Sequence, residues 1–130
     1  MITGEIDNKS QLIEENKNYT VMLVNAPQTR GHFIIFPKKH YSELSEFKNT
    51  GLFFEYSINM AEKIIKKLNA KAYVMKLNNK VFMLDDNPMH VGHIHCHIIP
   101  IYSDKDLSSK PKFIDKDKLI ALRDLLLDKK

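Results

Sequence analysis

Histidines alternate with apolar residues in one short run of this chain, from His93 to Pro100. The branched residues in the run favour an extended conformation, and Pro100 is predicted to end the strand. Side chains of a β-strand point alternately to its two faces. We therefore expect His93, His95 and His97 to share one face, and the residues between and after them to share a buried opposite face: Ile94, Cys96 and Ile98.

A row of imidazoles could bind a metal ion, because neutral imidazole is the commonest metal ligand in proteins. At about 3.3 Å per residue, the row extends roughly 13 Å from His93 to His97, which is too long for one zinc ion with Zn–N distances of about 2 Å. Cys96 is the single cysteine and is expected to face away from the row. We predict no metal site among these residues.

Phosphoryl chemistry suits the row better. An imidazole with a pKa near 6.5 is largely neutral at pH 7, so it can attack phosphorus without first losing a proton. His95, in the middle, is the natural nucleophile, and its attack would leave a covalent histidine ester for a second step. Its neighbours can donate hydrogen bonds to phosphoryl oxygens and pass a proton to the departing group. Histidines without a joint role remain the alternative, which the strict alternation disfavours.

The motif from His93 to Ile99, followed by Pro100, resembles the His-x-His-x-His-apolar-apolar signature of the histidine triad (HIT) superfamily of nucleotide hydrolases and transferases. A second segment, from Gly31 to His40, is similar to the Gly-His-apolar strand of the same family, which ends in Pro-Lys-Lys/Arg-His. The resemblance covers about residues 19–102. It implies a HIT-like α+β fold, with an antiparallel sheet of about five strands, one long helix and a C-terminal helix. It also implies a homodimer formed through a helix and a sheet edge.

By resemblance, His95 attacks the α-phosphorus, His97 and His93 orient and stabilise the phosphoryl oxygens, and His32 supports them as a fourth histidine. Asn25 matches an asparagine that some branches, including the fragile histidine triad type, use against the ribose. Its alternative role is to start the turn that follows. No metal is required for the chemistry in this family, although a magnesium ion can accompany a polyphosphate substrate.

The loop before the triad departs from the family. Relatives carry Gln-Ser/Thr-Val ahead of the triad, whereas this chain has Met89, His90 and Val91, so only the valine is kept. His90 either replaces the hydroxyl as a donor or is an ordinary loop residue, and the role of His40 is equally open. Asn78 or Asn79 is a loose match to an asparagine at the preceding strand end. The altered loop argues against a phosphoramidase.

Apolar periodicity predicts the remaining elements. Strands are expected at residues 19–24, 32–36 and 72–77, with the first two antiparallel across a turn at 25–28, and Leu12 and Ile13 anchor an edge strand. Residues 41–47 are expected to form a short helical turn, and residues 115–127 the last helix. The main helix runs from Asn49 or Thr50 to Asn69. Its apolar stripe consists of residues four apart, which are Leu52, Tyr56, Met60, Ile64 and Leu68, widened by Phe53, Ala61 and Ile65.

Composition indicates one globular domain over residues 1–130, with 43% hydrophobic and 28% charged residues. No apolar run approaches the ~18 residues that span a membrane, and no basic-then-apolar signal begins the chain. The single cysteine excludes an internal disulfide, so a cytoplasmic protein is expected. A net charge of +4, spread along the chain, favours anionic nucleotides over a specific nucleic-acid partner.

The sequence therefore predicts a nucleotide hydrolase or nucleotidyltransferase, with a small-molecule nucleotide as its ligand. It would cleave at the α-phosphate of a dinucleoside polyphosphate or a nucleoside monophosphate conjugate, through a nucleotidyl-His95 intermediate, with water or phosphate as acceptor. Asn25 and the altered loop favour the polyphosphate branch. Two alternatives stay open: a regulatory HIT protein that binds nucleotides with little turnover, and a zinc protein built on the triad.

Overall fold

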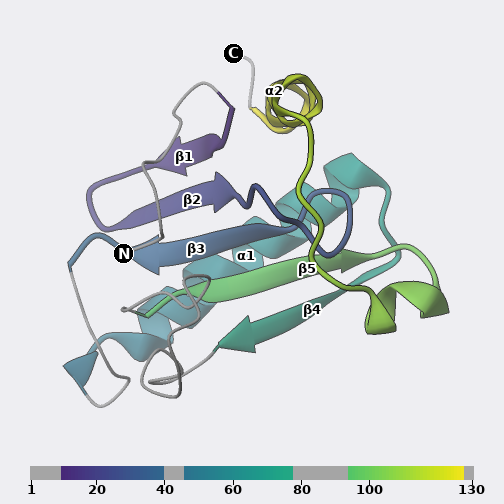
Figure 1. Ribbon diagram of the computed structural model, residues 1–130. Helices are drawn as coiled ribbons and strands as arrows, with labels where there is room; N and C mark the ends of the chain where they lie inside the picture. The colour runs from purple at the N-terminus through teal and green to yellow at the C-terminus, as the bar shows by residue number, and fades with distance from the viewer. Residues whose placement is uncertain (1–9, 40–45, 78–93, 128–130) are drawn as a thin grey trace, which may run out of the picture.

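The computed structural model describes residues 10–39, 46–77 and 94–127. Its sheet contains five strands, all paired antiparallel, in the order β1-β2-β3-β5-β4 (Figure 1). The strands and the two α-helices have the following bounds: β1 Leu12–Glu15, β2 Tyr19–Leu23, β3 Phe33–Pro37, α1 Thr50–Leu68, β4 Ala72–Leu77, β5 Cys96–Ile101 and α2 Lys116–Leu126. The predicted α+β class, with five strands, a long helix and a C-terminal helix, is confirmed.

The first three strands form a meander that places His32 at one end of the sheet. The side chain of Asn16 accepts hydrogen bonds from the backbone N–H groups of Asn18 and Tyr19, each at 2.8 Å, and so fixes the turn between β1 and β2. In the next pair, Val21 opposes Ile35 and Leu23 opposes Phe33. The predicted antiparallel pairing of these two strands is therefore confirmed.

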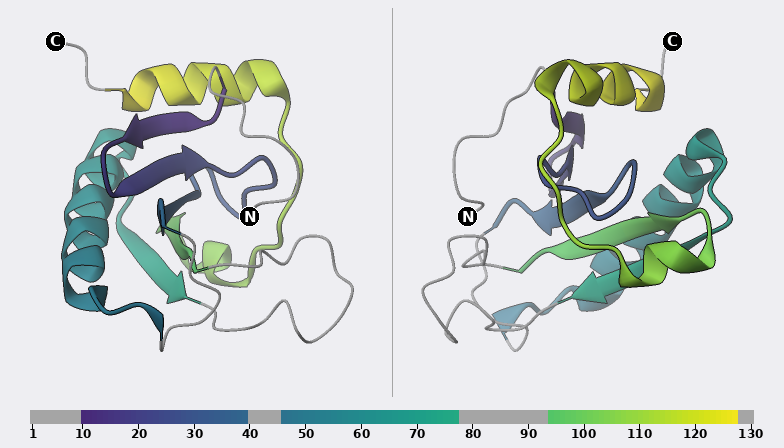
Figure 2. Two further views of the ribbon diagram at one scale, coloured as in Figure 1. Left: turned by 90° about the vertical axis from the view of Figure 1, so that its left-hand side faces the viewer. Right: turned by 45° about the vertical axis from the view of Figure 1, so that its right-hand side comes forward.

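Helix α1 covers one face of the sheet and closes the core, as the two views of Figure 2 show. It ends at Asn69, which adopts the left-handed conformation (φ 58°) that a helix C-cap favours. The core between α1 and the sheet is built from alternate strand residues together with helix residues: Val21, Leu23, Phe33, Ile35, Cys96, Ile98, Phe53, Ala61 and Ile64. Within the described ranges, neither helix has both the length and the apolar character needed to cross a bilayer.

The predicted stripe of α1 is wrong at Leu52, which is 61% exposed. Phe53, which was expected to widen the stripe, is buried as predicted, and Ser57 is buried as well. With 3.6 residues per turn, residues four apart drift by about 40° per step, so a stripe that faces the core at Leu68 has turned away from it by Leu52. Three residues of the stripe, Met60, Ile64 and Leu68, are buried as expected.

Strand β5 is also shifted from its expected bounds. It begins at Cys96, so His95 lies just before it, and it runs through Pro100 to Ile101. The expected stop at Pro100 is wrong because β3 pairs only with Cys96 to Ile98, so a residue without an N–H group leaves no ladder bond unmade there. The Pro100 carbonyl instead accepts a 2.6 Å hydrogen bond from the Thr29 hydroxyl.

Beyond β5, the chain makes an unpredicted 3-10 helix, η3 (Asp104–Ser108), and then crosses to α2 (Figure 2). The capping box between Ser103 and Asp106 explains where η3 begins. Helix α2 buries Leu119, Leu122 and Leu126, and its last carbonyls are approached by Lys67 of α1, whose ammonium donates to Leu126 O at 3.0 Å.

Gly31, directly before His32, packs closely against Leu68 at the end of α1. Its φ is +87°, and a Cβ added there would lie 2.5 Å from Leu68 Cδ1. Gly31→Ala is expected to lower the free energy of unfolding by roughly 1–3 kcal/mol, because it combines a left-handed backbone with a steric clash. The measurement is urea denaturation. Gly51→Ala is the matched control, since a Cβ there meets nothing within 4 Å, and a loss as large as that of Gly31→Ala would contradict the explanation.

Candidate active site

Three histidines meet on the face of the sheet that α1 leaves free. His97 lies in β5 opposite Ile34 of β3, and His32 precedes β3 by one residue on the same face. His95 lies two residues before His97 along the chain, and its ring centroid is 4.7 Å from that of His97. The His32 ring centroid is 5.1 Å from that of His97 on the other side. The residues that flank His95 and His97, namely Ile94, Cys96 and Ile98, are buried in the core, as the alternation predicts.

Hydrogen bonds link the three rings into a chain. The backbone N–H of Gln28 donates to His32 Nδ1 at 3.1 Å. His32 Nε2 lies 2.9 Å from His97 Nδ1, and His97 Nε2 lies 3.0 Å from His95 Nε2. Each contact is within hydrogen-bond distance, so a proton must occupy one of the two nitrogens in each pair.

The Gln28 N–H fixes the direction of this chain, because a backbone N–H can only donate. His32 therefore carries its proton on Nε2 when neutral and donates to His97 Nδ1. His97 in turn carries its proton on Nε2 and donates to His95 Nε2. The result is a lone pair, with no proton, on His95 Nε2: the nitrogen that a nucleophilic role requires.

Burial keeps the two supporting histidines neutral. It lowers the pKa of His97 from 6.5 to about 3, with smaller contributions from the charges of His95, His32 and Lys76. It lowers the pKa of His32 to about 4, and Lys76 and His95 again contribute. At neutral pH both rings therefore act as neutral hydrogen-bond donors rather than as imidazolium ions.

These lowered pKa values make stability depend on pH. Between about pH 6.5 and pH 4 the unfolded chain binds more protons than the folded one, so the free energy of unfolding falls as the pH falls. For the two histidines together, the free energy of unfolding is expected to fall by roughly 2–3 kcal/mol between pH 7 and pH 5.5. Urea titrations at both pH values measure the loss. The double variant His32→Gln/His97→Gln should show a much smaller difference, and an unchanged pH dependence would contradict the assignment.

Gln28 and Lys76 are members of the site that the sequence did not indicate. Gln28 contributes through its main chain, which has no signature in a sequence. Lys76 of β4 opposes His97 of β5, and this cross-strand pairing becomes visible only once the register is known. A lysine inside an otherwise apolar strand was the one available signal.

The other predicted site residues divide into two groups. Asn25 is exposed in the turn after β2, and its carbonyl accepts a 3.1 Å hydrogen bond from the N–H of Ile114, so its main chain helps to hold the segment before α2. The remaining candidates lie outside the described residues, and their roles stay predictions: His93, Asn78, Asn79, Met89, His90 and His40.

The buried thiol of Cys96 is expected to be unreactive. Burial raises its pKa to about 12, so the thiolate is scarce at neutral pH. Among residues 10–39, 46–77 and 94–127, no three histidine, cysteine or acidic side chains are grouped so that they could hold a metal ion.

Access to His95 is restricted, since the residue is only 6% exposed. His95 Nε2 also lies 3.0 Å from His97 Nε2, so this contact must break before His95 can attack a phosphorus atom. No histidine lines either of two cavities that lie among the described residues. A groove of about 680 Å³ is lined by Gln28 and Thr29, which lie in the turn before His32, and by the segment before α2.

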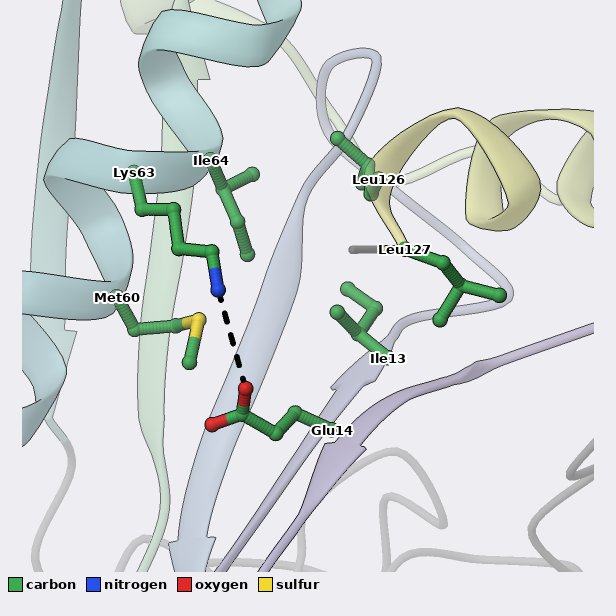
Figure 3. A pocket seen from close by; sticks show the side chains of 7 residues that line it. All are labelled: Ile13, Glu14, Met60, Lys63, Ile64, Leu126 and Leu127. Atoms are coloured by element: carbon green, nitrogen blue, oxygen red, sulfur yellow. Dashed lines mark ion pairs between the residues drawn. The ribbon is translucent and has the colours of Figure 1, made fainter. Parts of the chain in front are cut away.

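The second cavity, of about 170 Å³, lies between α1, β1 and the end of α2 (Figure 3). Lys63 and Glu14 face one another across it at 3.9 Å, beside apolar side chains that include Met60 and Leu126. The Tyr56 hydroxyl also donates to Glu14. This cavity belongs to the packing of the two helices rather than to the histidine cluster.

Residues 5–104 match the family model described as HIT domain. This chain belongs to the HIT family. It is 31% identical over 103 residues to an uncharacterized HIT-like protein of Methanocaldococcus jannaschii, a match that covers 78% of this chain and 75% of that protein. The resemblance seen in the two histidine motifs is thereby confirmed.

Solved structures share the fold at lower identity. A zinc-bound histidine triad family protein from Mycobacterium smegmatis aligns with a TM-score of 0.62 at 24% identity, covering 88% of this HIT chain and 82% of its own. Diadenosine triphosphate hydrolase from Plasmodium falciparum, in complex with Cyclomarin A, aligns with a TM-score of 0.71 at 16% identity, covering 95% and 77%. At these identities the likeness establishes the fold.

Proposed function

We propose that this HIT protein cleaves nucleotides at the α-phosphate through a nucleotidyl-His95 intermediate. The observation that carries the proposal is the directed hydrogen-bond chain from Gln28 through His32 and His97, which leaves a lone pair on His95 Nε2. Family membership supports the same chemistry. We assign His93, which belongs to the same motif, to the phosphoryl oxygens.

In the first step, His95 Nε2 forms a bond to the α-phosphorus while the bond from phosphorus to the bridging oxygen breaks. The electron pair of that bond leaves with the departing group. His97 Nε2–H turns from His95 to an oxygen of the phosphoryl group, where negative charge must be held. In the second step, water or phosphate attacks phosphorus, the P–N bond breaks, and its electron pair returns to Nε2. The proton that water loses passes to solvent, whereas phosphate attacks through an oxygen that carries no proton.

The neutral state of His97 favours one kind of leaving group. Burial lowers the pKa of His97 to about 3, so the ring is mostly neutral at pH 7 and is poorly suited to protonate a departing amine. A nucleoside phosphate departs as an oxyanion that is stable without that proton, since the second pKa of a phosphate ester is about 6. We therefore propose a dinucleoside polyphosphate as the substrate. The reaction requires no metal, although a magnesium ion can accompany the polyphosphate.

Two further observations agree with a polyphosphate substrate. Asn25 lies in the turn between β2 and His32, and we propose that its side chain contacts the ribose. Its backbone carbonyl accepts the hydrogen bond from Ile114 that holds the segment before α2. The Plasmodium falciparum relative is named as a diadenosine triphosphate hydrolase. We propose the same substrate class here, with Asn78, Asn79, His90 and Met89 as further contacts.

The test is incubation with diadenosine triphosphate and with adenosine 5′-phosphoramidate. Faster release of AMP from the triphosphate supports the proposal, and faster release from the phosphoramidate overturns the choice of leaving group. Binding of both compounds without product would favour a regulatory HIT protein. The replacement of the family's Gln-Ser/Thr by Met89 and His90 is the feature that supports this alternative. Near-stoichiometric zinc in the purified protein would contradict a metal-free reaction.

We also propose a homodimer formed through α1 and β4. Strand β4 is an edge of the sheet, and Phe54 and Ile58, one turn apart on α1, are 36% and 45% exposed. A strand edge that no other described strand pairs with and exposed apolar side chains on a helix are both typical of subunit interfaces.

Ile58→Glu is expected to raise the dimer dissociation constant by at least roughly 100-fold, because it places a charge in an apolar contact. Sedimentation velocity over a range of concentrations measures the change. Leu125→Glu is the matched control: Leu125 is 50% exposed on α2, away from the proposed interface, and its variant should stay dimeric. A monomeric unsubstituted protein, or a dimeric Ile58→Glu protein, would overturn this interface.

A further inference from the structure

Lys76 lies on the same face of the sheet as the histidines. It occupies β4, where Tyr73, Met75 and Leu77 pack against the core. Because strand side chains alternate, Lys76 must point to the opposite face. Its direct cross-strand partner there is His97 of β5.

The ammonium of Lys76 is available for a ligand. Lys76 is exposed, and no ion pair joins it to any carboxylate within residues 10–39, 46–77 and 94–127. Its positive charge nevertheless acts on the histidines, since it contributes to the lowered pKa of both His32 and His97. A lysine that no described carboxylate pairs with, beside neutral imidazoles, is a site of positive potential, which attracts an anion.

The length and flexibility of its side chain suit Lys76 to bind a phosphate next to the one that His95 attacks. Cross-strand partners have Cβ atoms about 4.5–5.5 Å apart, and a lysine adds a flexible four-carbon stem beyond its Cβ. An ammonium at the end of that stem can reach a phosphate next to the one that His95 attacks. It would bind that phosphate as a point charge, without the fixed geometry of an arginine.

We infer that Lys76 is a specificity-determining residue that binds the second phosphate of a polyphosphate substrate and so selects anhydrides over conjugates with an uncharged leaving group. This inference rests on the proposed function, since Lys76 would be the residue that recognises the polyphosphate substrate. The negative charge on the departing phosphate grows as its bond to the α-phosphorus breaks, so the ammonium stabilises the transition state more than the ground state.

The experiment compares Lys76→Met, Lys76→Arg and Lys71→Met on two substrates. Lys76→Met should lower kcat/KM for diadenosine triphosphate by roughly 10- to 100-fold and change that for adenosine 5′-phosphoramidate by less than about 3-fold. Lys76→Arg, which keeps the charge, should recover most of the loss. Lys71→Met removes an exposed lysine just before the same strand and should match the unsubstituted protein on both substrates.

Two further measurements separate recognition from folding. The effect of Lys76→Met on diadenosine triphosphate should shrink as ionic strength rises, because salt screens exposed charges. Without the charge of Lys76, the pKa values of His97 and His32 rise, so the acid limb of the pH profile should move to higher pH. Equal losses on both substrates, or no loss on either, would overturn the inference.

Failure of the proposed reaction can be told apart from failure of this inference. If neither substrate is turned over, the hydrolysis proposal fails, and binding still tests Lys76. By calorimetry the unsubstituted protein should bind ADP more tightly than AMP, and Lys76→Met should remove that difference. An ADP preference that survives in Lys76→Met would overturn the role of Lys76.

Discussion

Replacing His95 by alanine is expected to lower kcat for diadenosine triphosphate by roughly 10⁴-fold or more. The loss is large because no other described side chain presents an unprotonated nitrogen at the end of the hydrogen-bond chain through His97. Steady-state assays of AMP release measure it. A circular dichroism spectrum like that of the unsubstituted protein shows that the fold is kept.

Cys96→Ala is the matched control for this substitution. Cys96 is adjacent in sequence and buried, but it faces the core on the other side of the sheet. Its variant should lose stability by about 1 kcal/mol, because a small buried group has been removed, while keeping kcat within a few-fold. An enzyme that retains more than about one per cent of its activity without His95 would contradict the covalent mechanism.

His97→Ala is expected to lower kcat by roughly 10²- to 10⁴-fold, which is the usual range for removing a single donor or proton-transfer group. The substitution removes the N–H group that donates to the phosphoryl oxygen. It also removes the ring whose two hydrogen bonds connect His32 to His95. Single-turnover assays measure the chemical step directly. KM should change less than kcat, since the interaction strengthens in the transition state.

His97→Gln distinguishes donation from mere packing. A glutamine side chain keeps an N–H donor and similar length, so its kcat should lie between those of the unsubstituted protein and of His97→Ala. Equal activities in the alanine and glutamine variants would show that His97 acts through packing alone. His32→Ala should have a smaller effect than His97→Ala, because its ring reaches His95 only through His97.

Much of this fold follows from local sequence patterns. Alternation identified β2, β3 and β4 to within about a residue, and the left-handed C-cap at Asn69 ends α1 where the sequence indicates. The same alternation placed Ile94, Cys96 and Ile98 in the core and brought the rings of His95 and His97 into contact. Each of these features depends on neighbours along the chain, which the sequence displays directly.

Other features depend on contacts between distant segments. Pro100 continues β5 only because antiparallel β3 begins at Phe33, opposite Ile98, and so does not extend beside it. Lys76 joins the site only through the register of β4 and β5. The N–H of Gln28, which sets the tautomers of all three rings, is a backbone group that every residue except proline possesses. Main-chain donors and cross-strand partners of this kind cannot be read from residue types.

The measurement that tests the mechanism most directly is trapping of a nucleotidyl group labelled at the α-phosphate, followed by peptide mapping. The protein is mixed with labelled diadenosine triphosphate, quenched within one turnover and digested under conditions that preserve phosphoramidate bonds. The account predicts label on the peptide that contains His95, and no label in the His95→Ala protein. Rapid release of AMP without any labelled peptide, or label that persists in His95→Ala, would contradict it.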